Sequence, residues 1–191
     1  MKAMKGVWES LPSGASTFLS RALALFIAWK SLYILLLLPL GEPDGWLVRR
    51  LGESTVSILN IFHGGERYRV SHGIGVEWGA IRNRVHSSII YRPGVGSDLG
   101  IAASCNGLEL MALAVGFILC FQGTWGRKAA YALSVVAFVF MVNVVRCCLL
   151  TVIKTEHPVY FVFAHKYLFN LAGYGCVFLV WMRYIHRLTR V

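Results

Sequence analysis

The sequence predicts an all-α, polytopic membrane protein with about four transmembrane helices and a small extracytoplasmic β-hairpin or loop insert before the second span. Composition is the first observation behind this prediction. The 191 residues are 57% hydrophobic and 15% charged, which is too apolar for a water-soluble domain of this size. The second observation is a set of four apolar windows that approach the roughly 20 residues a bilayer-spanning helix needs. We expect residues 1–191 to form a single integral membrane domain.

The four predicted spans divide the chain. They cover approximately residues 18–40, 104–123, 129–153 and 161–184, and they leave an outer segment at 41–103. The fourth window is polar near its start, where it carries His165, Lys166 and Asn170. A short apolar run at 56–62 lies between polar neighbours and is too brief to cross a bilayer, so we expect an interfacial helix or loop there.

The first window could also be read as a cleaved signal peptide. Two charged residues, Arg21 and Lys30, interrupt its apolar run, and no small-x-small cleavage site precedes "GEPDG" at 41–45. We therefore expect this window to remain as a membrane span. Cleavage would leave the orientation of the other three spans unchanged.

Basic residues predict the orientation, because Lys and Arg are retained on the cytoplasmic side of short loops. They precede the first span, fill the turn between the second and third spans, and follow the fourth: Lys2, Lys5, Arg127, Lys128, Arg183, Arg187 and Arg190. We expect a multi-pass protein of the cytoplasmic (inner) membrane with both termini cytoplasmic. The segment 41–103 is then outside; it is also basic, but it is long enough to translocate largely regardless of charge.

The net charge of +10 has a membrane interpretation. Basic side chains near a bilayer are attracted to anionic lipid head groups, so we expect membrane lipid to be a partner. We expect no nucleic-acid binding, because no soluble basic domain or aromatic-laced basic groove accompanies the charge.

The outer segment contains the pattern of a small sheet. Between Tyr68 and Trp78 the side chains alternate with a period of two, which indicates a half-buried strand. Further on, "HSSIIY" and "SDLGIAA" flank "RPGVG", whose Pro and Gly residues mark a turn. We expect a hairpin that leads directly into Cys105, with an irregular loop as the alternative.

Three reactive side chains fall at one predicted depth. Cys105 lies about as far before the cytoplasmic turn at 125–126 as Arg146 lies after it, so the two residues meet in an antiparallel helix pair, roughly 30 Å from that turn at about 1.5 Å per residue. The outer turn at 155–156 pairs Arg146 with His165 in the same way. All three side chains are therefore expected at the extracytoplasmic edge of the hydrocarbon.

Each of these side chains also has a non-catalytic interpretation. An Arg near a helix end usually extends to the interface, a His near a helix start often forms an interfacial hydrogen bond, and a buried Cys is ordinarily a small hydrophobic residue. Their shared depth favours a site, because ionisable residues inside a membrane are costly.

The chemistry of these residue types is complementary. A thiolate is a nucleophile, and a nearby guanidinium or imidazolium stabilises it. Arg146 could hold the thiolate or the oxyanion of a tetrahedral intermediate. His165 could accept the thiol proton and return it to a leaving amine. His157 is a rival base, but it belongs to the outer turn and would have to fold back to reach Cys105.

Three further residues are expected to support this set. Asn106 follows the cysteine directly, Glu109 falls one helical turn after it, and Asn143 falls one turn before Arg146. We expect Glu109 and Asn143 to hold Arg146 in place, with a purely structural ion pair as the alternative for Glu109.

The remaining cysteines point to no second centre. They lie at a cytoplasmic helix end, in mid-span, or off the face that carries Arg146: Cys120, Cys147, Cys148 and Cys176. The spacing contains no CxxC motif and no His-rich metal site. We therefore predict no structural disulfide, no metal and no cofactor.

The ordered motifs resemble a known family. "SCNGLEL" opening one span, "NVVR" near the outer end of the next and "AHKYLFNLAGYG" opening the last are similar to the signature of the exosortase/archaeosortase family, whose members are polytopic membrane enzymes that resemble sortases in chemistry but not in fold. The resemblance covers residues from about 85 to 185. It implies that Cys105 is the nucleophile, Arg146 the electrostatic stabiliser and His165 the acid/base partner.

The same resemblance implies the partners. They are secreted proteins with a C-terminal tripartite sorting tail, made of a short motif, a transmembrane helix and a basic cluster, together with a possible cell-surface acceptor. Longer family members carry more spans, so this chain is identified as a compact member.

We therefore expect a membrane-embedded cysteine protease/transpeptidase that works through a thioester acyl-enzyme, which an amine or water resolves. An alternative is a non-catalytic membrane subunit of a polysaccharide export or assembly system, in which the polar cluster only locks the helices together. A third possibility is a lipid-modifying acyltransferase that uses the same cysteine.

Overall fold

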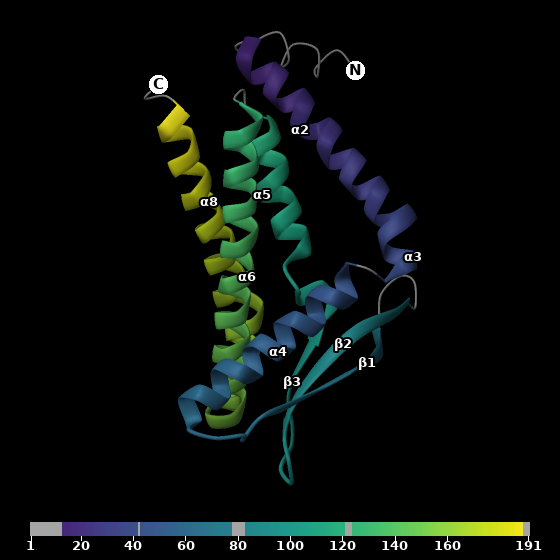
Figure 1. Cartoon of the computed structure of the whole chain (residues 1–191), viewed down its shortest axis with the longest axis vertical. Helices are drawn as coiled ribbons and strands as arrows, with labels where there is room; N and C mark the ends of the chain where they lie inside the picture. Colours follow the sequence, from purple (N-terminus) through teal and green to yellow (C-terminus); the bar gives the residue numbers. More distant parts are fainter. Residues whose placement is uncertain (1–12, 42, 78–82, 121–123, 189–191) are drawn as a thin grey trace.

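The computed structural model describes residues 13–41, 43–77, 83–120 and 124–188 (Figure 1). The helices are α2 (Ser13–Leu32), α3 (Leu38–Leu40), α4 (Asp44–His63), α5 (Leu108–Cys120), α6 (Trp125–Glu156), α7 (Pro158–Phe163) and α8 (Phe169–Leu188). π-Helical turns at Tyr33–Leu37 and Ala164–Leu168 join α2 to α3 and α7 to α8. Strands β1 (Arg69–Glu77), β2 (Asn83–Arg92) and β3 (Gly96–Ala102) form one sheet. The described chain is thus mostly helical with a small sheet.

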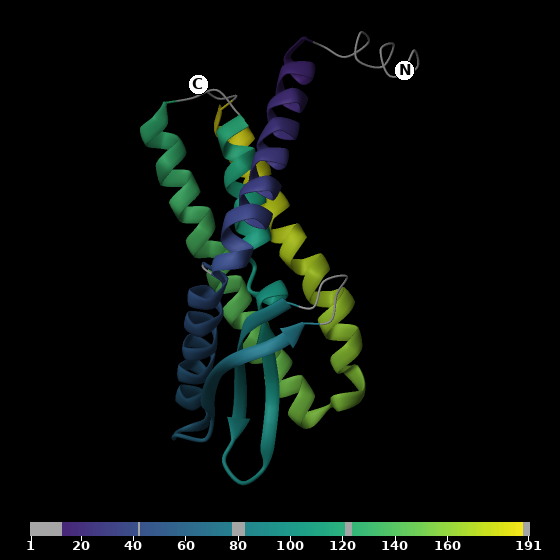
Figure 2. The same ribbon diagram turned by 90° about the vertical axis from the view of Figure 1, so that its right-hand side faces the viewer.

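The molecule is elongated, and different elements lie at its two ends (Figures 1 and 2). The start of α2, the end of α5, the start of α6 and the end of α8 lie together at one end of the molecule. The sheet, α4 and the connection from α6 to α7 lie at the other end. Helix α6 runs between these two ends, and α2 and α5 extend from the first end toward the sheet and α4 (Figure 1).

Among the residues that the structure describes, two helical segments are long and apolar enough to cross a membrane, Leu19–Leu37 and Trp125–Glu156. No residue in the most apolar window of the first is buried, as expected for a helix whose side chains face lipid. The second has 32 residues, which at about 1.5 Å each extend further than the roughly 30 Å of hydrocarbon. Because the 13 described residues of α5 are fewer than a span needs, the count of four spans stays a prediction.

Helix α4 corrects the interpretation of the outer segment. The run at 56–62 was expected to be a short interfacial helix or loop, but it is the end of a 20-residue helix that begins at Asp44. Its buried side chains recur at helical spacing: Leu47, Val48, Leu51, Thr55 and Leu59. Gly64 ends the helix in the left-handed conformation, with φ +68° and its N–H bonded to Asn60 O.

The sheet confirms the predicted hairpin, and the irregular-loop alternative is wrong. Strands β1 and β2 pair antiparallel from Arg69↔Tyr91 to Glu77↔Asn83, although Trp78, expected at the end of the first strand, lies outside the described residues. Strands β2 and β3 pair antiparallel across the Pro-Gly turn. The third strand then runs through a 3₁₀ turn, Ala103–Cys105, toward α5, so the sheet leads directly to the predicted nucleophile.

The hairpin between β2 and β3 carries a partly buried ion pair. Arg92 donates two hydrogen bonds of 2.9 Å to the carboxylate of Asp98, whose side chain is 6% exposed. These bonds raise the pKa of the Arg92 guanidinium, which therefore stays charged.

Two apolar cores meet at the segment that carries Cys105. One joins α4, the sheet and the second half of α6, and includes Leu51, Ile90, Ile101, Val144 and Leu150. The other joins α5, α6 and α8, and includes Met111, Ala114, Ile118, Val139 and Val177. The segment 103–107 connects the sheet to α5 and so lies at the junction of the two cores.

Candidate active site

The backbone turns sharply after Cys105. The N–H of Asn106 bonds to Ala103 O at 3.3 Å, and Gly107 has φ +82°, a conformation that favours glycine. A Cβ at Gly107 would lie 1.8 Å from Asn143 Nδ2, so a larger residue fits there only if the Asn143 side chain shifts. We call residues 105–107, which begin with the predicted nucleophile, the nucleophile corner.

Asn106 is the structural centre of this corner, with 2% of its surface exposed. Its Oδ1 accepts a hydrogen bond from the backbone N–H of Leu108 at 2.8 Å, which satisfies a free donor at the start of α5. Its backbone carbonyl accepts one from Asn143 Nδ2 at 3.2 Å. Its own Nδ2 donates to Asp44 Oδ1 at 2.5 Å. Asn106 and Asn143, both expected to support the site, are therefore joined directly.

Asp44 and Tyr33 are residues of this network that sequence reasoning missed. Asp44 begins α4, is 5% exposed, and accepts a second hydrogen bond from Tyr33 OH at 2.9 Å. The only local signal around Asp44 is the Pro and Gly content of "GEPDG" at 41–45, which indicates a turn. Nothing in that pattern indicates that the carboxylate reaches a residue 62 positions later in the chain.

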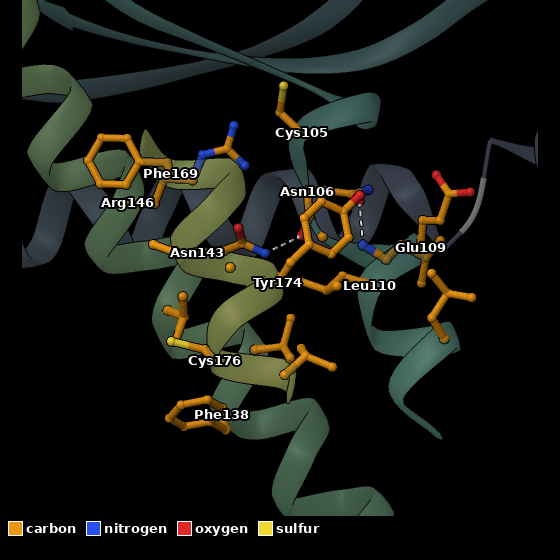
Figure 3. A pocket seen from close by; sticks show the side chains of 18 of the residues that line it. Cys105, Asn106, Glu109, Leu110, Phe138, Asn143, Arg146, Phe169, Tyr174 and Cys176 are labelled. Atoms are coloured by element: carbon orange, nitrogen blue, oxygen red, sulfur yellow. Dashed lines mark hydrogen bonds between the residues drawn. The ribbon is translucent and has the colours of Figure 1, made fainter. Parts of the chain in front are cut away.

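The nucleophile corner forms one side of a cavity of about 550 Å³ (Figure 3). Cys105, Asn106, Asn143 and Arg146 contribute to its lining. In Figure 3 the Cys105 thiol and the Arg146 guanidinium lie toward the same end, and Phe138 lies at the opposite end. The cavity is therefore polar beside the cysteine and apolar further along the helices, where Leu110, Leu113, Val142 and Val177 also line it.

Arg146 contacts His165, as their predicted shared depth required. Arg146 Nη2 donates toward His165 Nδ1 at 3.5 Å, and the histidine ring stacks on Phe161 with 5.7 Å between ring centroids and 2° between ring planes. Arg146 Nε is buried and has no hydrogen-bond partner among the described residues. The guanidinium is thus held at one edge by the histidine and keeps a further donor unused.

His165 contacts Arg146 but does not line the cavity. Arg146 lines the cavity, whereas His165 is absent from the described residues that do so. The rival base His157 lies at the end of α6 beside Tyr160, with 6.4 Å between their rings, and is likewise not part of that lining. The predicted convergence therefore joins Cys105 and Arg146 at the cavity and joins His165 to Arg146.

The expectation that Glu109 and Asn143 hold Arg146 is wrong. The carboxylate of Glu109 forms an ion pair with Lys30 of α2, and Asn143 donates to the backbone of Asn106. The alternative for Glu109, a structural ion pair, is what the structure contains. Sequence reasoning placed Glu109 on the correct helix face, but it had no means of placing α2 beside α5.

The other cysteines lie away from the corner or inside the core. All five cysteines are free thiols. Cys147 belongs to the core between α4, α6 and the sheet, Cys148 Sγ donates to Thr55 O at 3.8 Å, and Cys120 is buried at the far end of α5. Cys176 lines the cavity at a distance from the corner in Figure 3.

Comparison with known proteins identifies one family. A family model described as transmembrane exosortase matches residues 10–185. The match includes every helix from α2 to α7, most of α8, the whole sheet, and the residues that form the cavity and the Arg146–His165 contact. No curated protein and no solved structure gives a significant match.

Proposed function

The chain belongs to the transmembrane exosortase family, and on that premise we propose that it is a membrane cysteine transpeptidase or protease that cleaves the C-terminal sorting signal of secreted proteins on the extracytoplasmic side. The family is one of membrane transpeptidases or proteases that act on secreted proteins with such signals. Membership does not favour the alternative of a non-catalytic subunit in polysaccharide export. The specific substrate, nucleophile and mechanism are the proposal.

One observation carries the proposal. A single cavity of about 550 Å³ is lined by a half-buried thiol, a half-buried guanidinium and a long apolar surface. A peptide substrate needs all three: a nucleophile, a group that stabilises developing negative charge, and a surface that accepts apolar residues. The cavity has all three, and its thiol belongs to the segment that connects the sheet to α5.

The proposed reaction uses Cys105 as the nucleophile. Its thiolate sulfur bonds to the carbonyl carbon of the scissile peptide, and the carbonyl oxygen takes the negative charge. Arg146 stabilises this oxyanion, because a guanidinium stays protonated and presents several donors in one plane. The C–N bond then breaks, the leaving amine takes up the proton that the Cys105 thiol gave up, and a thioester remains on Cys105. Water then attacks the thioester to give a free carboxyl terminus, or an amine attacks it to give an amide; in both cases the proton lost by the attacking group restores the thiol.

His165 is the proposed acid/base partner, and its contact with Arg146 supports a second effect. In the present geometry it holds one edge of the guanidinium at 3.5 Å, so it also fixes the plane of the oxyanion donor. Direct proton transfer with Cys105 requires the imidazole to enter the cavity when a substrate is bound, as catalytic contacts often tighten only in the complex.

The test is cleavage of a tail-bearing substrate in cells. A secreted protein of the same genome with a C-terminal helix followed by arginines is tagged on both sides of that helix, and the released fragment is quantified by mass spectrometry. We expect Cys105→Ser to lower cleavage at least 100-fold. The matched control is Cys148→Ser, because a serine there can keep the bond to Thr55 O, and it should cleave within threefold of native. Native cleavage by Cys105→Ser would refute the proposal.

A further inference from the structure

We propose that Asp44 is a positioning residue for Cys105: through Asn106 it fixes the nucleophile corner against the face of α6 that carries Arg146. This inference rests on the proposed function of Cys105 and assigns a role to a residue some 60 positions away in the sequence.

The first step is the environment of the Asp44 carboxylate. Asp44 is 5% exposed, and burial of a charged group is costly unless hydrogen bonds compensate for the lost hydration. Both oxygens are used: Oδ1 accepts from Asn106 Nδ2 at 2.5 Å, and Oδ2 accepts from Tyr33 OH at 2.9 Å. The place of Asp44 in the first turn of α4 adds a favourable interaction with the helix dipole. The carboxylate is therefore held from two sides.

The second step runs from Asp44 to the nucleophile. Asn106 adjoins Cys105, and its side chain is fixed between Asp44 and the N–H of Leu108. Rotation of that side chain would break both bonds at once and free the turn. The turn leaves no room for a side chain at Gly107, because a Cβ there would lie 1.8 Å from Asn143 Nδ2. The position of the Cys105 backbone therefore depends on the bond from Asn106 to Asp44.

The third step links the corner to Arg146. Asn143 donates to the Asn106 carbonyl at 3.2 Å, and Arg146 follows one helical turn later on the same face of α6. Both residues line the cavity together with Asp44 and Cys105. A corner that is displaced from Asn143 is also displaced from the guanidinium. Asp44 thus sets the distance between the two groups that the reaction brings together.

The Asp44–Asn106 contact can be tested by exchanging its two partners. Asn106→Asp places two carboxylates face to face in a buried site, which is strongly unfavourable. The double variant Asp44→Asn with Asn106→Asp restores a bond between an amide and a carboxylate with donor and acceptor exchanged. In that variant residue 106 can still accept from Leu108 N, and residue 44 can still accept from Tyr33 OH. The control is Asp98→Asn, a buried aspartate of the sheet that is bonded to Arg92.

The readouts separate position from general stability. The rate of Cys105 alkylation by a small maleimide is measured on the purified full-length protein by mass spectrometry of its peptide. The unfolding temperature is recorded for every variant, and kcat and KM for tail cleavage are measured separately. We expect Asn106→Asp to slow alkylation and to lower kcat at least tenfold with KM within threefold of native. The double variant should recover to within threefold in both rates, and Asp98→Asn should keep native rates.

Three outcomes would overturn the inference. They are a double variant no faster than Asn106→Asp, an Asp98→Asn variant as slow as Asn106→Asp, or a loss that appears in KM alone. Alkylation does not require a substrate, so it reports on Asp44 even if the proposed function is wrong. Expected alkylation rates with no tail cleavage by the native protein would reject the enzyme proposal and keep the positioning role.

Discussion

Glycine is required at position 107 for two reasons, the backbone conformation and the lack of space for a side chain. Its φ of +82° puts it in the left-handed region, where a side chain costs about 1–2 kcal/mol. Its Cβ position is also occupied, since Asn143 Nδ2 lies 1.8 Å from it. The amide that closes the corner therefore uses the space that a methyl group would fill.

Replacement of Gly107 by alanine should consequently be far more harmful than the backbone strain alone. A matched control exists in Gly94, which has φ +80° but nothing within 4 Å of its Cβ position. Gly94→Ala should lower the free energy of unfolding by about 1–2 kcal/mol, and Gly107→Ala by at least about 1–3 kcal/mol more, as expected for overpacking. Denaturant unfolding in detergent measures both. Equal losses would mean that Asn143 moves aside at little cost.

At the residue scale, the sequence predicted the candidate site residues whose depth in the membrane follows from the number of residues between them and a helix connection. Cys105, Arg146 and His165 lie at countable distances from helix connections, and the contact between Arg146 and His165 confirms that part of the argument. Asp44 and Tyr33 could not be found in this way. Their place depends on how α2 and α4 fold back onto the start of α5, and no periodic pattern encodes that approach.

Among the elements, the hairpin was predictable and α4 was not. The hairpin has a period of two and a Pro-Gly turn, which are local signals. Helix α4 carries Arg49, Arg50 and Glu53, and it buries only one side of its surface. Its apolar residues are too sparse for a span, and their helical spacing can be recognised as a core face only when the sheet and α6 that cover them are known.

Close packing of α4 on the sheet gives an element-scale prediction. A Cβ at Gly45 would lie 2.6 Å from His86 Cδ2, so Gly45→Ala should push α4 away from β2 and lower the free energy of unfolding by about 1–3 kcal/mol. Gly116, in α5, has open space around its Cβ position, and alanine there should be neutral or stabilising by about 0.5–1 kcal/mol. Thermal unfolding of the two variants measures the contrast. A Gly45→Ala variant as stable as Gly116→Ala would show that this contact is loose.

For the whole molecule, the arrangement of ends determines how the site meets its substrate. The start of α2, the end of α5, the start of α6 and the end of α8 lie at one end, and the sheet and α4 lie toward the other (Figure 1). The nucleophile corner lies between the sheet and α5. The basic residues 127 and 128 adjoin the first of these ends, so the positive-inside rule predicts that it faces the cytoplasm. A thiol at the outer membrane edge could then meet a secreted chain that is still held by its own C-terminal helix.

The central claim is that Cys105 and Arg146 form one outward-facing site, and thiol labelling of intact cells tests it most directly. A membrane-impermeant maleimide is applied to cells, and the modified fraction of each cysteine is measured by mass spectrometry. Cys120, which is buried at the opposite end of α5, is the reference thiol that should stay unmodified. Arg92→Ala removes a guanidinium of the sheet and serves as the control for Arg146→Ala.

We predict that Cys105 is modified from outside while Cys120 is not. We also predict that Arg146→Ala slows modification of Cys105 at least tenfold and that Arg92→Ala leaves the rate within threefold of native. Of these two arginines, Arg146 lines the cavity together with the thiol and Arg92 does not. A Cys105 that reacts only after the cells are opened would contradict the orientation. A Cys105 that reacts equally fast in both variants would contradict the shared site.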